Sequence, residues 1–268
     1  MRKHHRPIEA SEAELTEMTR DLDDLHHDVG MPAMKEALAG VSDALRSGTS
    51  RATHRRTFLL GAGGALAGVG VLAAMASTPG LAAAASTSSP TPATSGNPEA
   101  GLSGTLAVAA LAASLENLAI YTYGQAAAAA GAGKLGTVPP AIGQFVTTVM
   151  AQHTQHAAAW NSLLTSAGKK KVTVTDPALT PTVETALGQV TTLTEVAQLA
   201  LKLENAAAQT YQVQAAKLKS KKAISVAATI QPVEMQHAAI LYYVLGEYPG
   251  IQTAAGTPLA FNPTTQAA

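Results

Sequence analysis

The sequence predicts an all-α protein, a four-helix bundle made of two copies of one helical hairpin. Three observations predict this fold. Ala- and Leu-rich stretches without strand signals fill residues 102–247, two pairs of motifs recur there at fixed spacing, and glycine or proline punctuates the stretches. Since each hairpin alone would leave an apolar face in water, the two copies are expected to pack face to face.

The boundaries of the four helices follow from start and stop signals. The first helix ends at Gly131, and Pro139 with Pro140 opens the second. Residues 172–182 form a long connection to the third helix. Pro232 lies inside the last helix and predicts a kink or a late start there. The predicted helices cover about residues 102–131, 139–167, 183–218 and 221–245.

The region before the bundle differs from it in composition. Ser11, acidic residues and an apolar spacing predict a short capped helix that is loosely held. His26 and His27 stand among aspartates, and we interpret them as part of a solvated charged face rather than as a metal site. The chain thus divides into a polar, partly helical cytoplasmic region (1–53), a signal segment (54–85), a linker (86–101), the bundle (102–247) and a tail (248–268).

Residues 54–85 have the pattern of an export signal. Arg55-Arg56 is followed closely by Phe58 and Leu59, then by a Gly/Ala-rich apolar run and a small-residue exit. The segment resembles a twin-arginine signal, which implies the twin-arginine export machinery as a partner and a location in the periplasm, the cell envelope or outside the cell. An apolar run of about eighteen residues can also span a bilayer, so a membrane anchor stays open.

Composition limits the remaining possibilities. Residues 86–101 are rich in Ser, Thr and Pro and predict a disordered linker. The net charge is zero, aromatics are few and no arginine follows the signal, so nucleic-acid binding is excluded. Because the chain has no cysteine, any metal must be held by nitrogen and oxygen ligands, which suit iron or manganese. Homo-oligomerisation stays open.

The helices contain a duplication. Leu-Glu-Asn at Glu116 is followed seven residues later by Tyr123, and the same motif recurs with the same spacing at Glu204 and Tyr211. A Gln-His-Ala-Ala motif likewise occurs in the second helix, at His156, and again in the fourth helix, at His237. A residue and its neighbour seven positions on share one helix face. The repeat therefore places each glutamate and its tyrosine on the same side of a helix.

The repeated faces collect ionisable residues. The sequence after the signal has only three histidines, and all three lie in the recurring motifs. If these faces point inward, three carboxylates and three imidazoles meet in the core, where unpaired charges cost several kcal/mol each. A bound pair of metal ions resolves that cost. The predicted ligands are Glu116, His153, His156, Glu204, Glu234 and His237.

This arrangement resembles the ferritin-like di-iron carboxylate superfamily over roughly residues 102–247. The resemblance implies Glu116 and Glu204 as single or bridging carboxylates and Glu234 with His237 as a Glu-x-x-His pair. It places Tyr123 and Tyr211 beside the site. It also implies two iron ions, with manganese as the alternative, and an oxidoreductase role in iron oxidation or peroxide handling.

One position departs from that family pattern. His153 stands where a glutamate is expected, which removes one negative charge from the ligand set. The consequence is an altered dinuclear site, a single metal, or compensation by Gln152 or Gln155 as second-shell donors. A degenerate bundle without enzymatic activity, with a structural, stress-related or partner-binding role, is the alternative function.

Overall fold

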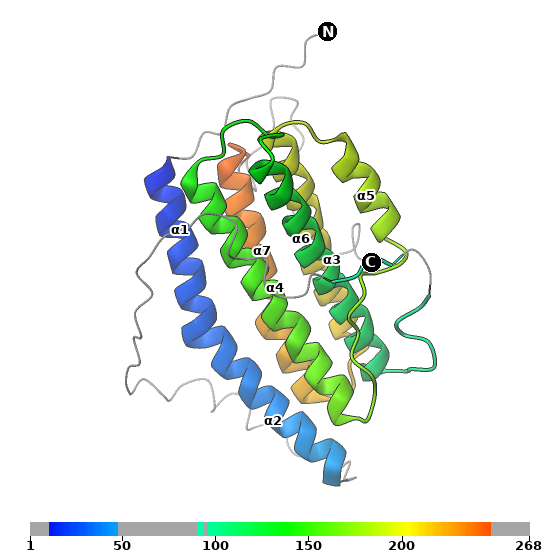
Figure 1. Ribbon diagram of the computed structural model, residues 1–268. Helices are drawn as coiled ribbons and strands as arrows, with labels where there is room; N and C mark the ends of the chain where they lie inside the picture. The colour runs from blue at the N-terminus through cyan, green and yellow to red at the C-terminus, as the bar shows by residue number, and fades with distance from the viewer. Residues whose placement is uncertain (1–10, 48–89, 94–95, 248–268) are drawn as a thin grey trace, which may run out of the picture.

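The structure is a computed structural model that describes residues 11–47, 90–93 and 96–247, with only the backbone described for 40–47. The predicted signal segment and C-terminal tail lie outside the described residues. Within the described part the fold is all-α, as predicted, and four long helices form a bundle (Figure 1). They are α3 (Thr105–Gly131), α4 (Pro140–Ser166), α6 (Leu193–Ala215) and α7 (Lys221–Val244).

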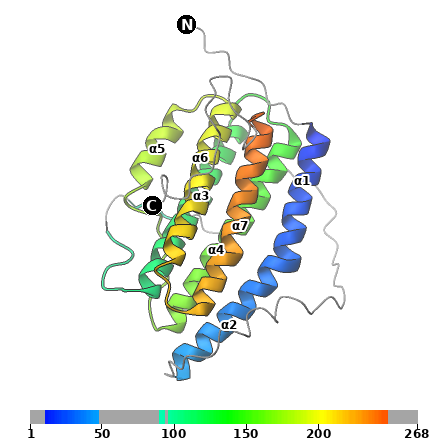
Figure 2. The same ribbon diagram turned by 180° about the vertical axis from the view of Figure 1, so that it is seen from behind.

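The two predicted hairpins are present. Helix α3 packs mainly on α4, and α6 mainly on α7, with a weaker contact between α3 and α6 (Figure 2). Helix α3 is long and apolar enough to cross a membrane by length and composition, but here it is a core helix of the bundle. The four-helix bundle of two repeated hairpins is therefore confirmed.

The third helix was predicted as one continuous helix over residues 183–218, and this prediction is wrong. A separate helix α5 (Thr180–Gln189) precedes α6, and the chain leaves helical geometry at Val190. Thr192 and Glu195 then form a capping box, in which the Thr192 hydroxyl accepts from the Glu195 amide and the carboxylate of Glu195 accepts from the backbone. This reciprocal capping stabilises a new helix start and accounts for the break.

Helix α7 begins at Lys221, as predicted, and of the two effects expected from Pro232, a kink or a late start, the late start is absent. The Ser220 hydroxyl accepts from the Ala223 amide and caps the helix, which continues through Pro232 to Val244. Proline inside a helix removes one backbone hydrogen bond and is normally costly. Val233 and Glu234, which follow it, are buried, and packing of this face keeps the helix intact.

The N-terminal region is a firm part of the fold. Helix α1 (Glu12–Leu25), a π-helical turn η1 (His26–Gly30) and α2 (Met31–Ser47) run together along the outside of α4 and α7 (Figures 1 and 2). The predicted cap at Ser11 is present. The predicted loose attachment is wrong, because Leu15, Leu22 and Met34 are buried against the bundle.

Backbone hydrogen bonds join the predicted linker to the loop before α5, and side chains of α3 and α4 hold that loop on the bundle. Thr91 pairs with the strand-like stretch at Val174, through the Thr91 amide to the Thr173 carbonyl at 3.3 Å. The Asn117 and Asn161 side chains both donate to the Val172 carbonyl, at 3.1 and 3.0 Å. Residues 90–93 of the linker are thus held in place by a loop that is itself fixed to α3 and α4.

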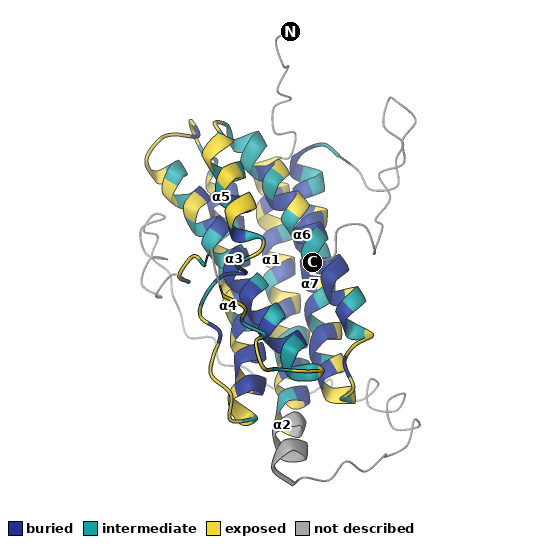
Figure 3. Cartoon of the chain, turned by 90° about the vertical axis from the view of Figure 1, so that its right-hand side faces the viewer, coloured by how far each residue is buried: buried dark blue, intermediate teal, exposed yellow. Residues whose placement is uncertain are grey.

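Two apolar clusters fill the bundle, one at each end. Trp160, Leu164 and Ile230 belong to one cluster, and Phe145 and Val149 to the other. Exposed side chains lie on the outer faces and on α5 (Figure 3). Between the two clusters lies a layer of buried ionisable and amide side chains, which forms the candidate site.

Candidate metal centre

The six predicted ligands meet in the middle of the bundle. Each of the four bundle helices contributes, and each of these side chains is at most 3% exposed to solvent. Burial this complete is rare for carboxylates unless they are paired or bind a metal. The contributions are Glu116 from α3, His153 and His156 from α4, Glu204 from α6, and Glu234 and His237 from α7.

These donors form two overlapping groups, and within each group the ligand atoms lie within 4.8 Å of one another. His153 and Glu234 belong to both groups, whereas Glu116 and Glu204 belong to one each. Of the two roles considered for Glu116 and Glu204, the geometry therefore favours single ligands, and the shared positions are His153 and Glu234. The groups are Glu116, His153, His156 and Glu234, and His153, Glu204, Glu234 and His237.

His153 lies between the two halves of the cluster. Its Nδ1 is 2.8 Å from Glu116 Oε2, and its Nε2 is 3.3 Å from Glu204 Oε1. The imidazole therefore presents one ring nitrogen to each single carboxylate. In the position where the family pattern has a carboxylate, this chain has a group that is positive or neutral but never negative.

His156 and Glu234 supply the observation that tests whether the residues fit a cation. His156 Nδ1 lies 2.9 Å from Glu234 Oε1, yet neither ring nitrogen of His156 and neither oxygen of Glu234 has a hydrogen-bond partner. These atoms meet only as an ion pair, and an ion pair without well-formed hydrogen bonds offsets less of the cost of burying two charges. A cation bound between them would satisfy carboxylate oxygens and imidazole nitrogens together. The donor set of nitrogen and oxygen suits iron or manganese.

Amide side chains lie next to the cluster, with unequal roles. Gln152 Oε1 lies 2.8 Å from His237 Nε2, within hydrogen-bond distance, which restricts the orientation of that imidazole. Gln155 has its hydrogen bond elsewhere, to His26 Nε2 at 2.6 Å. Gln155 is thus linked to the cluster only through His26, its partner in the N-terminal region.

His26 was predicted to lie on a solvated face, and this prediction is wrong. The His26 side chain is 1% exposed and its ring lies edge-on to His156, with ring centroids 5.2 Å apart. Asp23 also approaches the centre, through Gln152 Nε2 at 3.4 Å. The signal that locates His26 is the apolar spacing of Leu15 and Leu22, because that spacing gives the helix a face that must be buried.

Each tyrosine binds the glutamate of the other hairpin. Tyr123 donates to Glu204 Oε1 at 2.6 Å, and Tyr211 donates to Glu116 Oε1. Trp160 Nε1 in turn donates to the Tyr211 hydroxyl at 2.8 Å. Burial and the neighbouring carboxylates raise the pKa of both tyrosines well above 10, which keeps their hydroxyls protonated as donors.

The charges of the metal-free cluster balance internally. Burial by itself raises the pKa of Glu116, but His156 and His153 outweigh it and lower the pKa to about 2. Burial likewise lowers the pKa of His156, and the facing carboxylates reverse this and raise it to about 9. The pKa values of His153 and His237 are raised against burial by Glu204 and Glu234. Imidazolium ions and carboxylates are therefore paired when no metal is bound.

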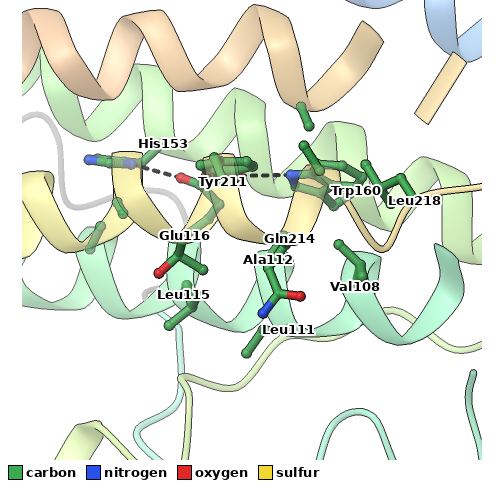
Figure 4. A pocket seen from close by; sticks show the side chains of 15 residues that line it. Val108, Leu111, Ala112, Leu115, Glu116, His153, Trp160, Tyr211, Gln214 and Leu218 are labelled. Atoms are coloured by element: carbon green, nitrogen blue, oxygen red, sulfur yellow. Dashed lines mark hydrogen bonds and ion pairs between the residues drawn. The ribbon is translucent and has the colours of Figure 1, made fainter. Parts of the chain in front are cut away.

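A narrow apolar pocket reaches the cluster between α3 and α6. Glu116 and His153 lie at its inner end, and His153, Tyr211 and Trp160 follow one another along it in Figure 4. A second pocket along the same seam reaches His153 and Glu204. Both are lined largely by alanine and leucine. The α3–α6 side of the centre is thus narrow and apolar, in contrast to the α4–α7 side, which the N-terminal helices cover.

Comparison with known proteins agrees with this geometry. The family model of the ferritin-like domain matches residues 104–247, which is more than half of the chain and includes every helix of the bundle. The chain belongs to the ferritin-like domain family. No curated protein and no solved structure matches it.

Proposed function

We propose that this chain is an exported metal-dependent redox protein that binds two divalent ions, iron in the first place and manganese as the alternative. The carrying observation is the pair His156 and Glu234, whose buried nitrogen and oxygen atoms approach to 2.9 Å and have no hydrogen-bond partner. The proposed role is iron oxidation or peroxide removal. The partners would be metal ions and the twin-arginine export machinery.

Each of the two donor groups would bind one metal ion. The group containing Glu116 and His156 would hold one ion, and the group containing Glu204 and His237 the other, with the two shared residues between them. Iron bound here supplies one-electron redox chemistry. The protein's own part is to fix the carboxylates through the tyrosine hydroxyls and to exclude bulk water by burial.

The apolar seam between α3 and α6 supports a small reactant. Its lining offers few polar groups apart from the cluster, and it is too narrow for a bulky organic substrate. Dioxygen and hydrogen peroxide are small enough to pass between alanine side chains. This favours oxidation of a bound ion over chemistry on a large substrate.

A second function is favoured by the charge balance of the metal-free cluster. Three carboxylates face three imidazoles, and the raised pKa values of His153, His156 and His237 allow protons to do the neutralising that a metal would do. A bundle of this kind is a degenerate member of the family with a structural, stress-related or partner-binding role. Its site would be stable without metal, because each buried charge has a partner.

Export is proposed from the sequence of residues 54–85, which lie outside the described residues. The pair Arg55-Arg56 followed by an apolar run supports twin-arginine transport to the periplasm, the envelope or the exterior, with a retained membrane anchor as the alternative. Replacing both arginines by lysine and fractionating cells tests this. Retention of the variant inside the cell supports export, and unchanged distribution overturns it.

Elemental analysis of the full-length protein, produced with iron and manganese in excess, tests the metal centre. We expect stoichiometric metal in the wild type and its loss in Glu204→Ala. Glu184→Ala is the matched control, because Glu184 is half-buried outside the cluster and accepts a hydrogen bond from Tyr121. Well under one metal per chain in the wild type overturns the first function and favours the second.

A further inference from the structure

The two halves of the metal centre are not supported equally. His237 Nε2 is bound by Gln152, which lies on the opposite hairpin. The residue at the repeat-related position, one before the Glu-x-x-His motif, is Val233, which has no polar atom to offer. His156 Nε2 accordingly has no hydrogen-bond partner. One imidazole of the centre is therefore held by an amide, and its counterpart lacks that support.

The N-terminal region reaches the half of the centre whose histidine, His156, has no amide partner on Nε2. His26, from the π-helical turn η1, lies edge-on to the His156 ring at 5.2 Å and 70°. It is fixed there by the 2.6 Å hydrogen bond from its Nε2 to Gln155 Oε1, one residue before His156. His26 thus restricts the orientation of His156 from outside the bundle.

The local geometry of the turn aims His26 inward. A π-helical turn inserts one extra residue into a helix and is found often at functional sites. Here it separates α1 from α2 at the level of the cluster. Gly30 lies against His26, and a Cβ atom at residue 30 would come within 3.4 Å of His26 Nδ1. Residue 30 is thus within contact distance of the His26 ring.

The whole N-terminal region covers the α4–α7 side of the centre. Leu15 and Leu22 from α1 and Met34 from α2 are buried on the bundle, on either side of His26. On the outer face of the same helix, Leu25 and Val29 are 45% and 58% exposed. Among the side chains described for this region, the inner face is thus mostly apolar, with Thr19 and His26 as its buried polar residues.

We propose that residues 12–47 are a removable cover of the metal centre, in which His26 is a positioning residue for His156. This rests on the proposed function and adds a point of control to it. The cover precedes residues 54–85, while the bundle follows them. Export either cuts the chain between the cover and the bundle or leaves the two on opposite sides of a membrane. In either case the cover is separated from the bundle. The centre is then closed before export and opened on its α4–α7 side afterwards.

A matched pair of histidine variants tests the positioning role in the full-length protein. His26→Gln removes the buried imidazole, and His27→Gln removes its half-exposed neighbour, which contacts Asp23. With Co²⁺ as the probe, we expect His26→Gln to speed metal removal by a chelator about tenfold, the scale seen for losses of outer-shell partners. His27→Gln should leave the rate unchanged. Equal rates in both variants overturn the role of His26.

A second pair tests the cover. Leu22→Asp places a charge on the buried face of α1, and Leu25→Asp places the same charge on its exposed face. We expect faster Co²⁺ removal and faster tryptic cleavage after Arg20 only in Leu22→Asp, because an undocked helix is open to both reagents. Faster cleavage with unchanged Co²⁺ removal would show that the segment undocks without controlling the centre, and would overturn the proposal.

Nitrogen NMR of the histidine rings separates this inference from the proposed function. If the wild type binds no Co²⁺, the proposed function fails. The metal-free rings still report on the contact, because His26→Gln should shift the His156 signals and His27→Gln should not. If Co²⁺ binds and neither variant changes its removal or the His156 signals, the inference fails and the proposed function stands.

Discussion

The two hairpins of the bundle start from the same pattern and end with different halves of a site. In α3–α4 and in α6–α7 alike, a glutamate and a tyrosine seven residues apart face the core, and each tyrosine reaches across to the other glutamate. The halves differ at the position that both donor groups share, where the first hairpin has His153 and the second has Glu234. The shared pattern builds the bundle, and the exceptions determine its chemistry.

At the positions where the two hairpins differ, the first hairpin has the side chain that forms a hydrogen bond. Gln152 binds His237, whereas the related Val233 binds nothing. Trp160 donates to Tyr211, whereas the related Leu241 has no donor for Tyr123. A symmetrical fold therefore carries an asymmetrical centre. The N-terminal helices reach both halves, through His26 beside His156 and through Asp23, which accepts from Gln152.

The largest expected effect comes from removing the shared carboxylate. Glu234→Ala takes a ligand from both donor groups, so we expect loss of both metal ions. His153→Ala, at the related position, should weaken binding but retain metal, because it removes a neutral ligand and leaves the negative charge of the carboxylates in place. Elemental analysis of the two purified variants measures the difference. Equal retention of metal would show that the two shared positions are equivalent.

Restoring the family pattern should sharpen the comparison. His153→Glu gives both hairpins a Glu-x-x-His motif and adds a fourth carboxylate, so we expect tighter metal binding. Without metal, the new carboxylate is buried beside Glu116 and Glu204, and an uncompensated buried charge costs about 3–5 kcal/mol. Thermal unfolding with and without metal measures both effects. A variant as stable as the wild type without metal would contradict the charge balance described above.

The pH dependence should have opposite signs with and without metal. In the metal-free protein the raised pKa values of His153, His156 and His237 give stability that is complete below about pH 6.5 and is lost as pH rises through about 9, the pKa of His156. The lowered pKa of Glu116 gives stability present above about pH 4.3 and lost as pH falls toward about 2.

Metal binding requires unprotonated imidazoles, so metal affinity should rise over the same alkaline range in which the metal-free protein loses stability. Melting temperatures of the two forms at pH 6 to 9 measure the two slopes. His153→Glu is the informative variant, since it removes one of the two imidazoles of the first hairpin and should flatten the alkaline loss. An unchanged melting temperature of the metal-free wild type from pH 6 to 9 would contradict the imidazolium–carboxylate pairing.

The smallest effect is expected from the tyrosines. Tyr211→Phe leaves both Trp160 Nε1 and one oxygen of Glu116 without this partner, whereas Tyr123→Phe affects only Glu204. With about 1 kcal/mol for each hydrogen bond lost, Tyr211→Phe should cost about 2 kcal/mol and Tyr123→Phe about half of that. Urea unfolding of the metal-free variants measures the difference. Equal costs would show that Trp160 contributes only packing.

The sequence by itself determined the helical class, the duplication and the six ionisable residues that meet in the core. It could do so because helix periodicity and a repeated spacing fix which residues share a face, and an amphipathic face must be buried. At Thr192 a local signal was missed, because the capping box that starts α6 is itself a sequence pattern. At Pro232 the local rules left a kink or a late start open, and the helix runs through the proline from Lys221.

Only the tertiary structure decided which helices meet and how closely. The apolar spacing of Leu15 and Leu22 marks a face but does not name its partner, so the docking of α1 on α4 and α7 could not be read from it. The burial of His26 depends on that docking and on a π-helical turn. The sharing of His153 and Glu234 depends on distances of a few ångströms between hairpins. Contacts between segments far apart in the chain arise from packing, which no local pattern specifies.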